Sequence, residues 1–118
     1  MSAPPTLEHI QRRLRDFVVA RDWDQFHNPK NLASALVVEA GELLEHFQWL
    51  TPEQADALPQ ETRAEVEHEI ADVLLFLLRL CDRLGIDPLR AAAGKLALNA
   101  EKYPVDKARG RSTKYDKL

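Results

Sequence analysis

Two pairs of acidic residues carry the strongest chemical signal in this sequence. Glu39 and Glu42 form one pair, and Glu69 and Asp72 form the other. Each pair is spaced i, i+3, which places its two carboxylates on one face of a helix. These faces also carry the apolar residues Leu32, Leu36, Ala40, Leu43 and Phe47, and Val66, Val73, Phe76, Leu77 and Leu80. We therefore expect both pairs to lie where their helices pack against neighbours.

Carboxylates in such a position need a positive charge nearby, because burying a free charge costs roughly several kcal/mol. Neither apolar face carries a lysine or arginine between residues 32 and 78. A single ExxE pair is usually a solvated helix face, but two pairs on apolar faces favour a metal site. Four oxygen donors favour Mg²⁺, with Mn²⁺ as a substitute, over zinc. Since Mg²⁺ keeps positions open for water and phosphate oxygens, the pattern indicates phosphate chemistry.

Composition narrows the class of protein. The chain has 118 residues and a net charge of −3, which predicts one domain over residues 1–118 and no binding of nucleic acid or membranes. We expect residues 1–5 and about 105–118 to be extended tails. Cys81 is the single cysteine and lies in an apolar run, which indicates a core residue in a reducing compartment. The N-terminus lacks a signal sequence, so we expect a cytoplasmic protein.

Hydrophobic periodicity predicts an all-α fold, with four main helices and one short helical turn in a bundle. Thr6 is the expected N-cap of a first helix that ends near Asp22, and Asn31 that of a second helix that ends near Trp49 and Leu50. The capping sequence from Thr51 to Gln54 predicts the short turn. The remaining helices are expected over about 60–84, before Gly85, and over about 88–103.

The long third helix is apolar on nearly every side. Between Val73 and Leu80 only Arg79 interrupts the apolar run. A helix with no solvent face must be covered on all sides by other protein segments. The other helices of a chain this small are too few to cover every side of it. The sequence therefore predicts a homo-oligomer built across this helix.

The acidic motif identifies a family resemblance. Glu39-x-x-Glu42, a spacer of 26 residues and Glu69-x-x-Asp72 resemble the ExxE…ExxD signature of the MazG-like all-α nucleoside triphosphate pyrophosphohydrolases. The resemblance is closest to the dCTP pyrophosphatase branch and runs from about Thr6 to Leu118. Further residues carry it: Arg21 to Trp23, Gln25 to His27, Asn31 and Leu32, Phe47 to Trp49, Lys95, Asn99, Tyr103, Pro104, Lys114 and Tyr115.

The resemblance implies an Mg²⁺-dependent nucleotide pyrophosphohydrolase. Its expected reaction is cleavage of a dNTP, above all dCTP or a modified dCTP, to the monophosphate and pyrophosphate, as house-cleaning of the nucleotide pool. The four acidic residues would bind Mg²⁺, and Glu42 is the preferred general base, although the sequence does not distinguish it from Glu39 or Glu45. The family also implies a homotetramer formed as a dimer of dimers.

The resemblance further implies a set of substrate-binding residues: Trp23, His27, Trp49, Phe76, Lys95, Asn99 and Lys102. The two tryptophans would line the base pocket, while Lys95 and Asn99, assisted by Lys102, would contact phosphates or sugar. Four of them have a plainer alternative: a core position for both tryptophans, which suits Trp49 better than Trp23, a surface loop for His27, and an exposed helix face for Lys95. The basic C-terminal tail either folds over the site or is solvated.

Two positions depart from the dCTP-directed pattern. Leu14 stands where those relatives have a histidine, and Phe76 stands where they have a tyrosine. Neither change touches the acidic motif, so the expected reaction class is unaffected while the base preference is less firmly indicated. The same reaction with broader dNTP or dUTP specificity, or on phosphoribosyl-ATP, is the first alternative. A non-catalytic helical module that binds a cationic partner is the second.

Overall fold

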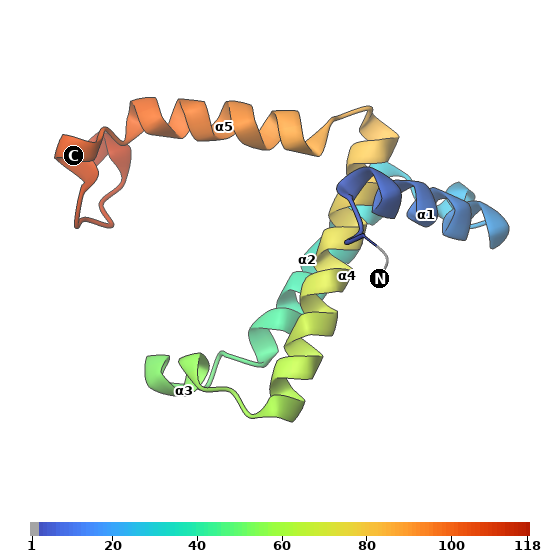
Figure 1. Ribbon diagram of the computed structural model, residues 1–118, viewed down its shortest axis with the longest axis horizontal. Helices are drawn as coiled ribbons and strands as arrows, with labels where there is room; N and C mark the ends of the chain where they lie inside the picture. Colours follow the sequence, from blue (N-terminus) through green and yellow to red (C-terminus); the bar gives the residue numbers. More distant parts are fainter. Residues whose placement is uncertain (1–2) are drawn as a thin grey trace. The chain divides into compact units, whose positions relative to one another are not determined.

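The computed structural model describes residues 3–118, which are helical with short connections (Figure 1). No strand occurs in this part of the chain, so the predicted all-α class is confirmed. The chain divides into two compact units, one ending at Gly85 and one beginning at Ile86. The elements are α1 (Leu7–Ala20), η1 (Asp24–Phe26), α2 (Pro29–Glu45), α3 (Pro52–Asp56), α4 (Gln60–Leu84), α5 (Pro88–Lys102), α6 (Val105–Ala108) and η2 (Tyr115–Lys117).

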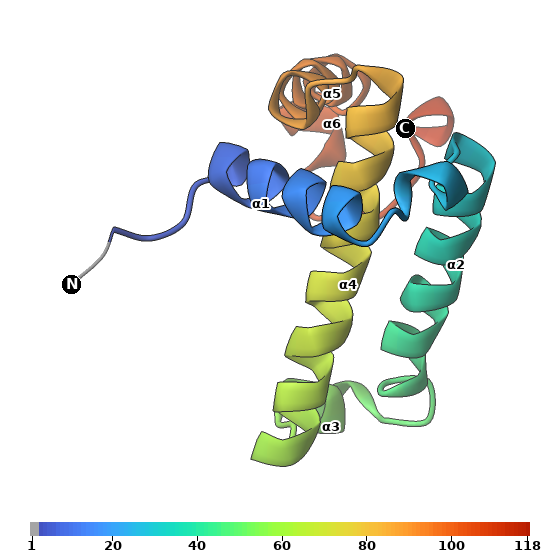
Figure 2. The same cartoon turned by 90° about the vertical axis from the view of Figure 1, so that its right-hand side faces the viewer.

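The core of the first unit lies where α2 and α4 run antiparallel beside each other (Figure 2). Leu32 of α2 and Leu78 of α4 are almost completely buried, and α1 packs across α4 through the buried Val18. Cys81 is also buried, which confirms its expected place in the core. This packing holds the faces of α2 and α4 that carry the acidic pairs against each other.

Several helix ends match the sequence prediction. Thr6 caps α1 by accepting a hydrogen bond from the N–H of His9, and Thr51 forms a reciprocal capping box with Gln54 at the start of α3. Asp87 caps α5 directly before Pro88. Gly85 ends α4 with a φ of 67°, a left-handed conformation that glycine adopts without steric cost.

The predicted bounds of the second helix were wrong at both ends. Its N-cap is Asn28 rather than Asn31, because the Asn28 side chain accepts a hydrogen bond of 2.9 Å from the N–H of Asn31. Pro29 then occupies the first helical turn, where its missing N–H leaves nothing unpaired. The helix ends at Glu45, since the chain then tightens into turns such as the bond from the N–H of Phe47 to the Leu44 carbonyl.

The second unit consists of α5, α6 and η2. The segment 105–118, which was expected to be an extended tail, contains the last two of these elements. Tyr103 and Tyr115 meet edge to face with ring centroids 6.0 Å apart, and the Lys102 ammonium lies 4.9 Å from the Tyr115 ring centroid. Among residues 3–118, no helix has the length and apolar character that a membrane crossing requires.

Candidate functional site

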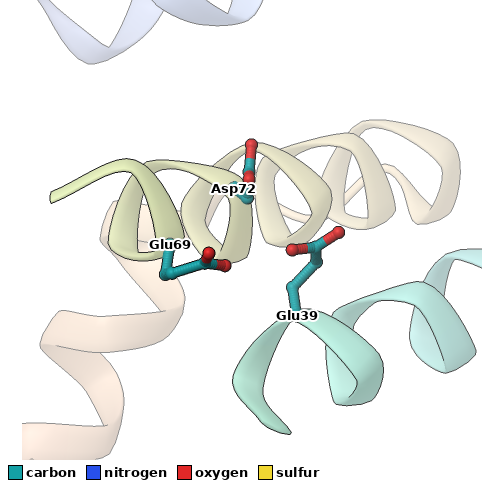
Figure 3. Close-up of side chains that lie close together, drawn as sticks. All are labelled: Glu39, Glu69 and Asp72. Carbon is teal, nitrogen blue, oxygen red and sulfur yellow. The ribbon is translucent and has the colours of Figure 1, made fainter. Parts of the chain in front are cut away.

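Three of the four motif carboxylates meet between α2 and α4 (Figure 3). Glu39 comes from α2, and Glu69 and Asp72 come from α4. One oxygen from each lies within 4.8 Å of the others, as a shared cation requires. The fourth, Glu42, is exposed, and it lies close enough to raise the pKa of both glutamates. The structure therefore brings together three of the four carboxylates that the sequence analysis predicted as metal ligands, and the fourth, Glu42, lies nearby at the solvent side.

The cluster is electrostatically unfavourable in the absence of a cation. Burial raises the pKa of Glu39, and the neighbouring Glu42, Asp72 and Glu69 raise it further. Burial also raises the pKa of Glu69, as do the carboxylates of Glu42 and Asp72. Among the described residues, the Oε2 atoms of Glu39 and Glu69 are buried and have no hydrogen-bond partner. Oxygen donors that are buried, unpaired and mutually repelling fit a hard divalent cation.

His46 lies beside this cluster at the end of α2, and the sequence analysis missed it. Its Nε2 is 3.9 Å from Glu69 and its Nδ1 is 3.7 Å from Glu65. The imidazole acts on Glu69 in the opposite direction to burial and lowers the pKa of that carboxyl. His46 is the only partly compensating group that reaches Glu69 among the described residues, so the negative charge of the cluster remains largely uncompensated.

A cavity of about 270 Å³ opens next to Asp72, within the first unit. Its walls are mostly apolar and contain three of the predicted substrate-binding residues, Trp23, His27 and Phe76. The full lining is Leu14, Phe17, Val18, Trp23, His27, Asp72, Leu75, Phe76 and Arg79. Trp23 is 43% exposed and meets Phe17 edge to face at 5.7 Å. A half-exposed indole at a cavity beside a carboxylate cluster is suited to an aromatic ligand that also carries phosphates.

Arg79 is the main residue of the cavity that the sequence analysis did not assign. The residue is 6% exposed, although arginine is rarely buried unless paired. It donates to Asp24, to Asp82 at 3.0 Å and, from Nε, to Nδ1 of His27 at 3.2 Å. Burial and the Arg79 charge lower the pKa of His27, against the opposing effect of Asp24. In the sequence, Arg79 stands out as one arginine in an apolar helical run. Its partner Asp82 is three residues away, but Asp24 and His27 lie 55 and 52 residues away.

The other predicted substrate-binding residues lie elsewhere. Trp49 is 86% exposed, which excludes the core position considered for it, and it does not line the cavity. Lys95, Asn99 and Lys102 all belong to α5 in the second unit, where Lys95 is exposed and Asn99 is half-buried. Contacts of these four residues with a substrate stay predictions.

A family model, two curated relatives and a solved structure all match this chain and agree on the kind of protein that it resembles. The model of the MazG-like family matches residues 35–118. The chain is 43% identical over 119 residues to dCTP pyrophosphatase 1 of Mus musculus and 44% identical over 120 residues to that of Homo sapiens, in each case covering 99% of this chain and 70% of the relative. A crystal structure of a pyrophosphatase from Archaeoglobus fulgidus superposes with a TM-score of 0.80 at 40% identity, covering 88% of this chain and 97% of that one. The chain therefore belongs to the MazG-like family.

Proposed function

We propose that this protein is a nucleoside triphosphate pyrophosphohydrolase that cleaves a deoxynucleoside triphosphate, with dCTP or a modified dCTP as the leading substrate. The products are the monophosphate and pyrophosphate. The carboxylate cluster beside an apolar cavity that contains Trp23 carries this proposal. Similarity to two proteins named dCTP pyrophosphatase 1, over nearly the whole chain, supports the choice of substrate.

Mg²⁺ is the proposed cofactor, with Mn²⁺ as a substitute. Glu39, Glu69 and Asp72 would hold it, and Glu42 lies near enough to join them or to act on water. When bound, a divalent cation neutralises the charge of phosphate oxygens and of the departing pyrophosphate. The buried Oε2 atoms of Glu39 and Glu69 support this assignment, since neither has a hydrogen-bond partner among the described residues.

The carboxylates also provide a general base. A water molecule attacks the α-phosphorus, the bond from that phosphorus to the bridging oxygen breaks, and pyrophosphate leaves with the bonding electron pair. The proton of the water passes to a carboxylate. Glu42 is the proposed base because it is exposed while its neighbours Glu39 and Glu69 carry the buried oxygens, and Glu39 is the second choice.

The nucleobase would occupy the cavity. The Trp23 indole offers a face for stacking, Phe76 gives an apolar wall, and His27 supplies a polar edge. Trp49, Lys95, Asn99 and Lys102 stay in the proposed substrate-binding set. We also retain, as proposals, a single domain over residues 1–118, a homotetramer and a cytoplasmic location.

A nucleotide panel tests this proposal. Purified protein is incubated with Mg²⁺ and each of dCTP, dTTP, dUTP, dATP and dGTP, and pyrophosphate release is measured. We expect dCTP to have the highest kcat/KM. In ¹⁸O-labelled water, the label should enter dCMP and not pyrophosphate, because the attack occurs at the α-phosphorus. Release of inorganic phosphate, or label in pyrophosphate, would contradict the reaction, whereas preference for another base would contradict only the substrate.

A further inference from the structure

Carboxylates from η1 and α4 hold the guanidinium of Arg79, and an arginine of α1 holds one of these carboxylates in turn. The Arg79 guanidinium contacts Asp24 of η1 and Asp82 of α4, and Asp82 also accepts two bonds, of 2.9 and 3.0 Å, from Nε of Arg15 in α1. Arg83 adds a longer contact of 3.9 Å to Asp24. A guanidinium that is buried and held by two carboxylates has little rotational freedom. The Nε–H of Arg79 is therefore held in place toward His27.

That contact determines where the proton of His27 resides. Arginine only donates hydrogen bonds, so Nδ1 of His27 must accept the bond from Nε of Arg79. A neutral imidazole with an accepting Nδ1 carries its proton on Nε2. The imidazolium form is disfavoured, because it would place a second N–H against the arginine, and the lowered pKa of His27 agrees with a neutral ring.

A fixed Nε2–H gives His27 a defined hydrogen-bond donor at a cavity that it lines. His27 and Arg79 both line a cavity whose other walls are mostly apolar, and the His27 ring lies 6.5 Å from Trp23 between centroids. In such surroundings a donor held in place has a large effect on which edge of a ligand is accepted, since leaving a polar group unpaired is costly there. The O2 and N3 atoms of cytosine are acceptors of the required kind.

We propose that Arg79 is a positioning residue for base recognition, which holds His27 as its Nε2–H tautomer so that this nitrogen donates to an acceptor atom of the nucleobase. This inference rests on the proposed function, because it states how the same site recognises its base. It assigns Arg79 no contact with the reacting phosphates. Arg79 should thus affect nucleotide binding rather than the chemical step.

Histidine ¹⁵N NMR tests the tautomer without any reaction. The ring nitrogens of His27 are assigned from the signals that disappear in His27→Leu, and the spectrum of the wild-type protein is recorded near neutral pH. We expect a protonated Nε2 and an unprotonated Nδ1. In Arg79→Lys, which keeps the positive charge but loses the Nε–H donor, the two tautomers should mix. A wild-type His27 that carries its proton on Nδ1, or on both nitrogens, would overturn the proposal.

Kinetics with dCTP test the consequence for binding. Arg79→Lys should raise KM about tenfold, the typical effect of one hydrogen bond, and change kcat by less than about twofold. The matched control is Arg83→Lys, because Arg83 lies on the same helix and contacts the same Asp24. Within residues 3–118 the hydrogen bond to Nδ1 of His27 comes from Arg79 and not from Arg83, and lysine keeps the positive charge that Arg83 places near His27. We expect this control to leave both constants within about twofold of wild type.

A double-mutant cycle separates positioning from a purely structural role. In a His27→Leu background there is no imidazole to orient, so Arg79→Lys should have almost no further effect on KM. Equal effects in both backgrounds, or equal effects of Arg79→Lys and Arg83→Lys, would show that Arg79 acts only through the fold. A wild-type protein that cleaves no nucleoside triphosphate would instead overturn the proposed function, and base recognition with it.

Discussion

Two carboxyls of the candidate site, Glu39 and Glu69, favour the protonated form more than an ordinary glutamate does, and a bound cation should act in the opposite direction. Burial and mutual repulsion raise the pKa of both Glu39 and Glu69 above the ordinary value of 4.5. A carboxyl with a raised pKa in the folded state stabilises the fold below pH 4.5 and loses that contribution as pH rises through its folded pKa. At neutral pH the metal-free site therefore opposes folding.

Mg²⁺ should remove this penalty in a pH-dependent way. We expect Mg²⁺ to raise Tm much more at about pH 7.5 than at about pH 4.5, because protonated carboxylates do not bind it. At a concentration one hundred times Kd the gain is about 2.7 kcal/mol. Glu69→Gln should reduce the gain, whereas Glu67→Gln, at an exposed position on the same helix, should not. Equal shifts in Tm at both pH values would exclude these carboxylates as the ligands.

Trp23 should contribute to binding through its aromatic face. Trp23→Ala is expected to raise KM for dCTP by roughly five- to a hundredfold, since stacking of an aromatic side chain on a base is worth about 1–3 kcal/mol. Trp23→Phe should retain most of the affinity, because the edge-to-face contact with Phe17 and a stacking surface can remain. Steady-state kinetics check this, and a KM for Trp23→Ala equal to that of the wild type would place the base elsewhere.

At the scale of elements, the sequence predicts a helix end well when the residues that form the cap are neighbours in the chain. The bounds of α4 and the caps at Thr6, Thr51 and Asp87 follow from residues within one helical turn. The start of α2 was mispredicted because Asn28 and Asn31 are both competent caps, and only the loop before Pro29 decides between them. The side chain of Asn31 instead donates to the Phe26 carbonyl in that loop.

The site itself was predictable only in part. The i, i+3 spacing of the acidic pairs, combined with apolar faces, predicted that carboxylates from two helices converge, as Glu39, Glu69 and Asp72 do. The bonds of Arg79 to Asp24 and His27 span 55 and 52 residues, and no periodicity within one helix encodes such pairs. Sequence patterns identify what a helix face contains, but contacts between a loop and a helix depend on the tertiary fold.

Replacing two glycines by alanine, one at a helix end and one inside a helix, should change the free energy of unfolding in opposite directions. Gly85→Ala should destabilise the protein by about 1 kcal/mol or more, because a φ of 67° is strained for alanine. Gly41→Ala should stabilise it by about 0.5–1 kcal/mol, since Gly41 is helical and an added Cβ would meet no atom within 4 Å. Urea denaturation measures both changes, and changes of the same sign would contradict the assignment of these positions.

At the scale of the whole molecule, α4 has a second apolar face. One face packs on α2, and the other leaves Ile70, Leu74, Leu77 and Leu84 between 41% and 52% exposed. These four residues recur at helical spacing, so they form one stripe rather than scattered positions. An exposed apolar stripe of this kind is typical of a protein interface. It supports the predicted homo-oligomer through α4.

Disrupting this stripe should dissociate the oligomer. We expect the wild-type protein to elute as an oligomer in size-exclusion chromatography with light scattering, and Leu74→Glu to shift it toward the monomer, because a buried charge at the interface is costly. Ala64→Glu introduces the same side chain at an exposed position nearer the start of α4 and should have no effect on mass. A wild-type protein of monomer mass would contradict the interface.

The most direct test of the proposed catalytic centre compares dCTP cleavage by the wild type, Glu69→Gln and Glu67→Gln with Mg²⁺ present. Glutamine keeps the size of glutamate but removes the charge, so Glu69→Gln should lower kcat by at least about a hundredfold. Glu67→Gln, whose side chain is exposed and pairs with Arg63 one helical turn away, should retain wild-type activity. If the wild type releases dCMP and pyrophosphate and Glu69→Gln does so just as fast, the carboxylate cluster is not the catalytic centre.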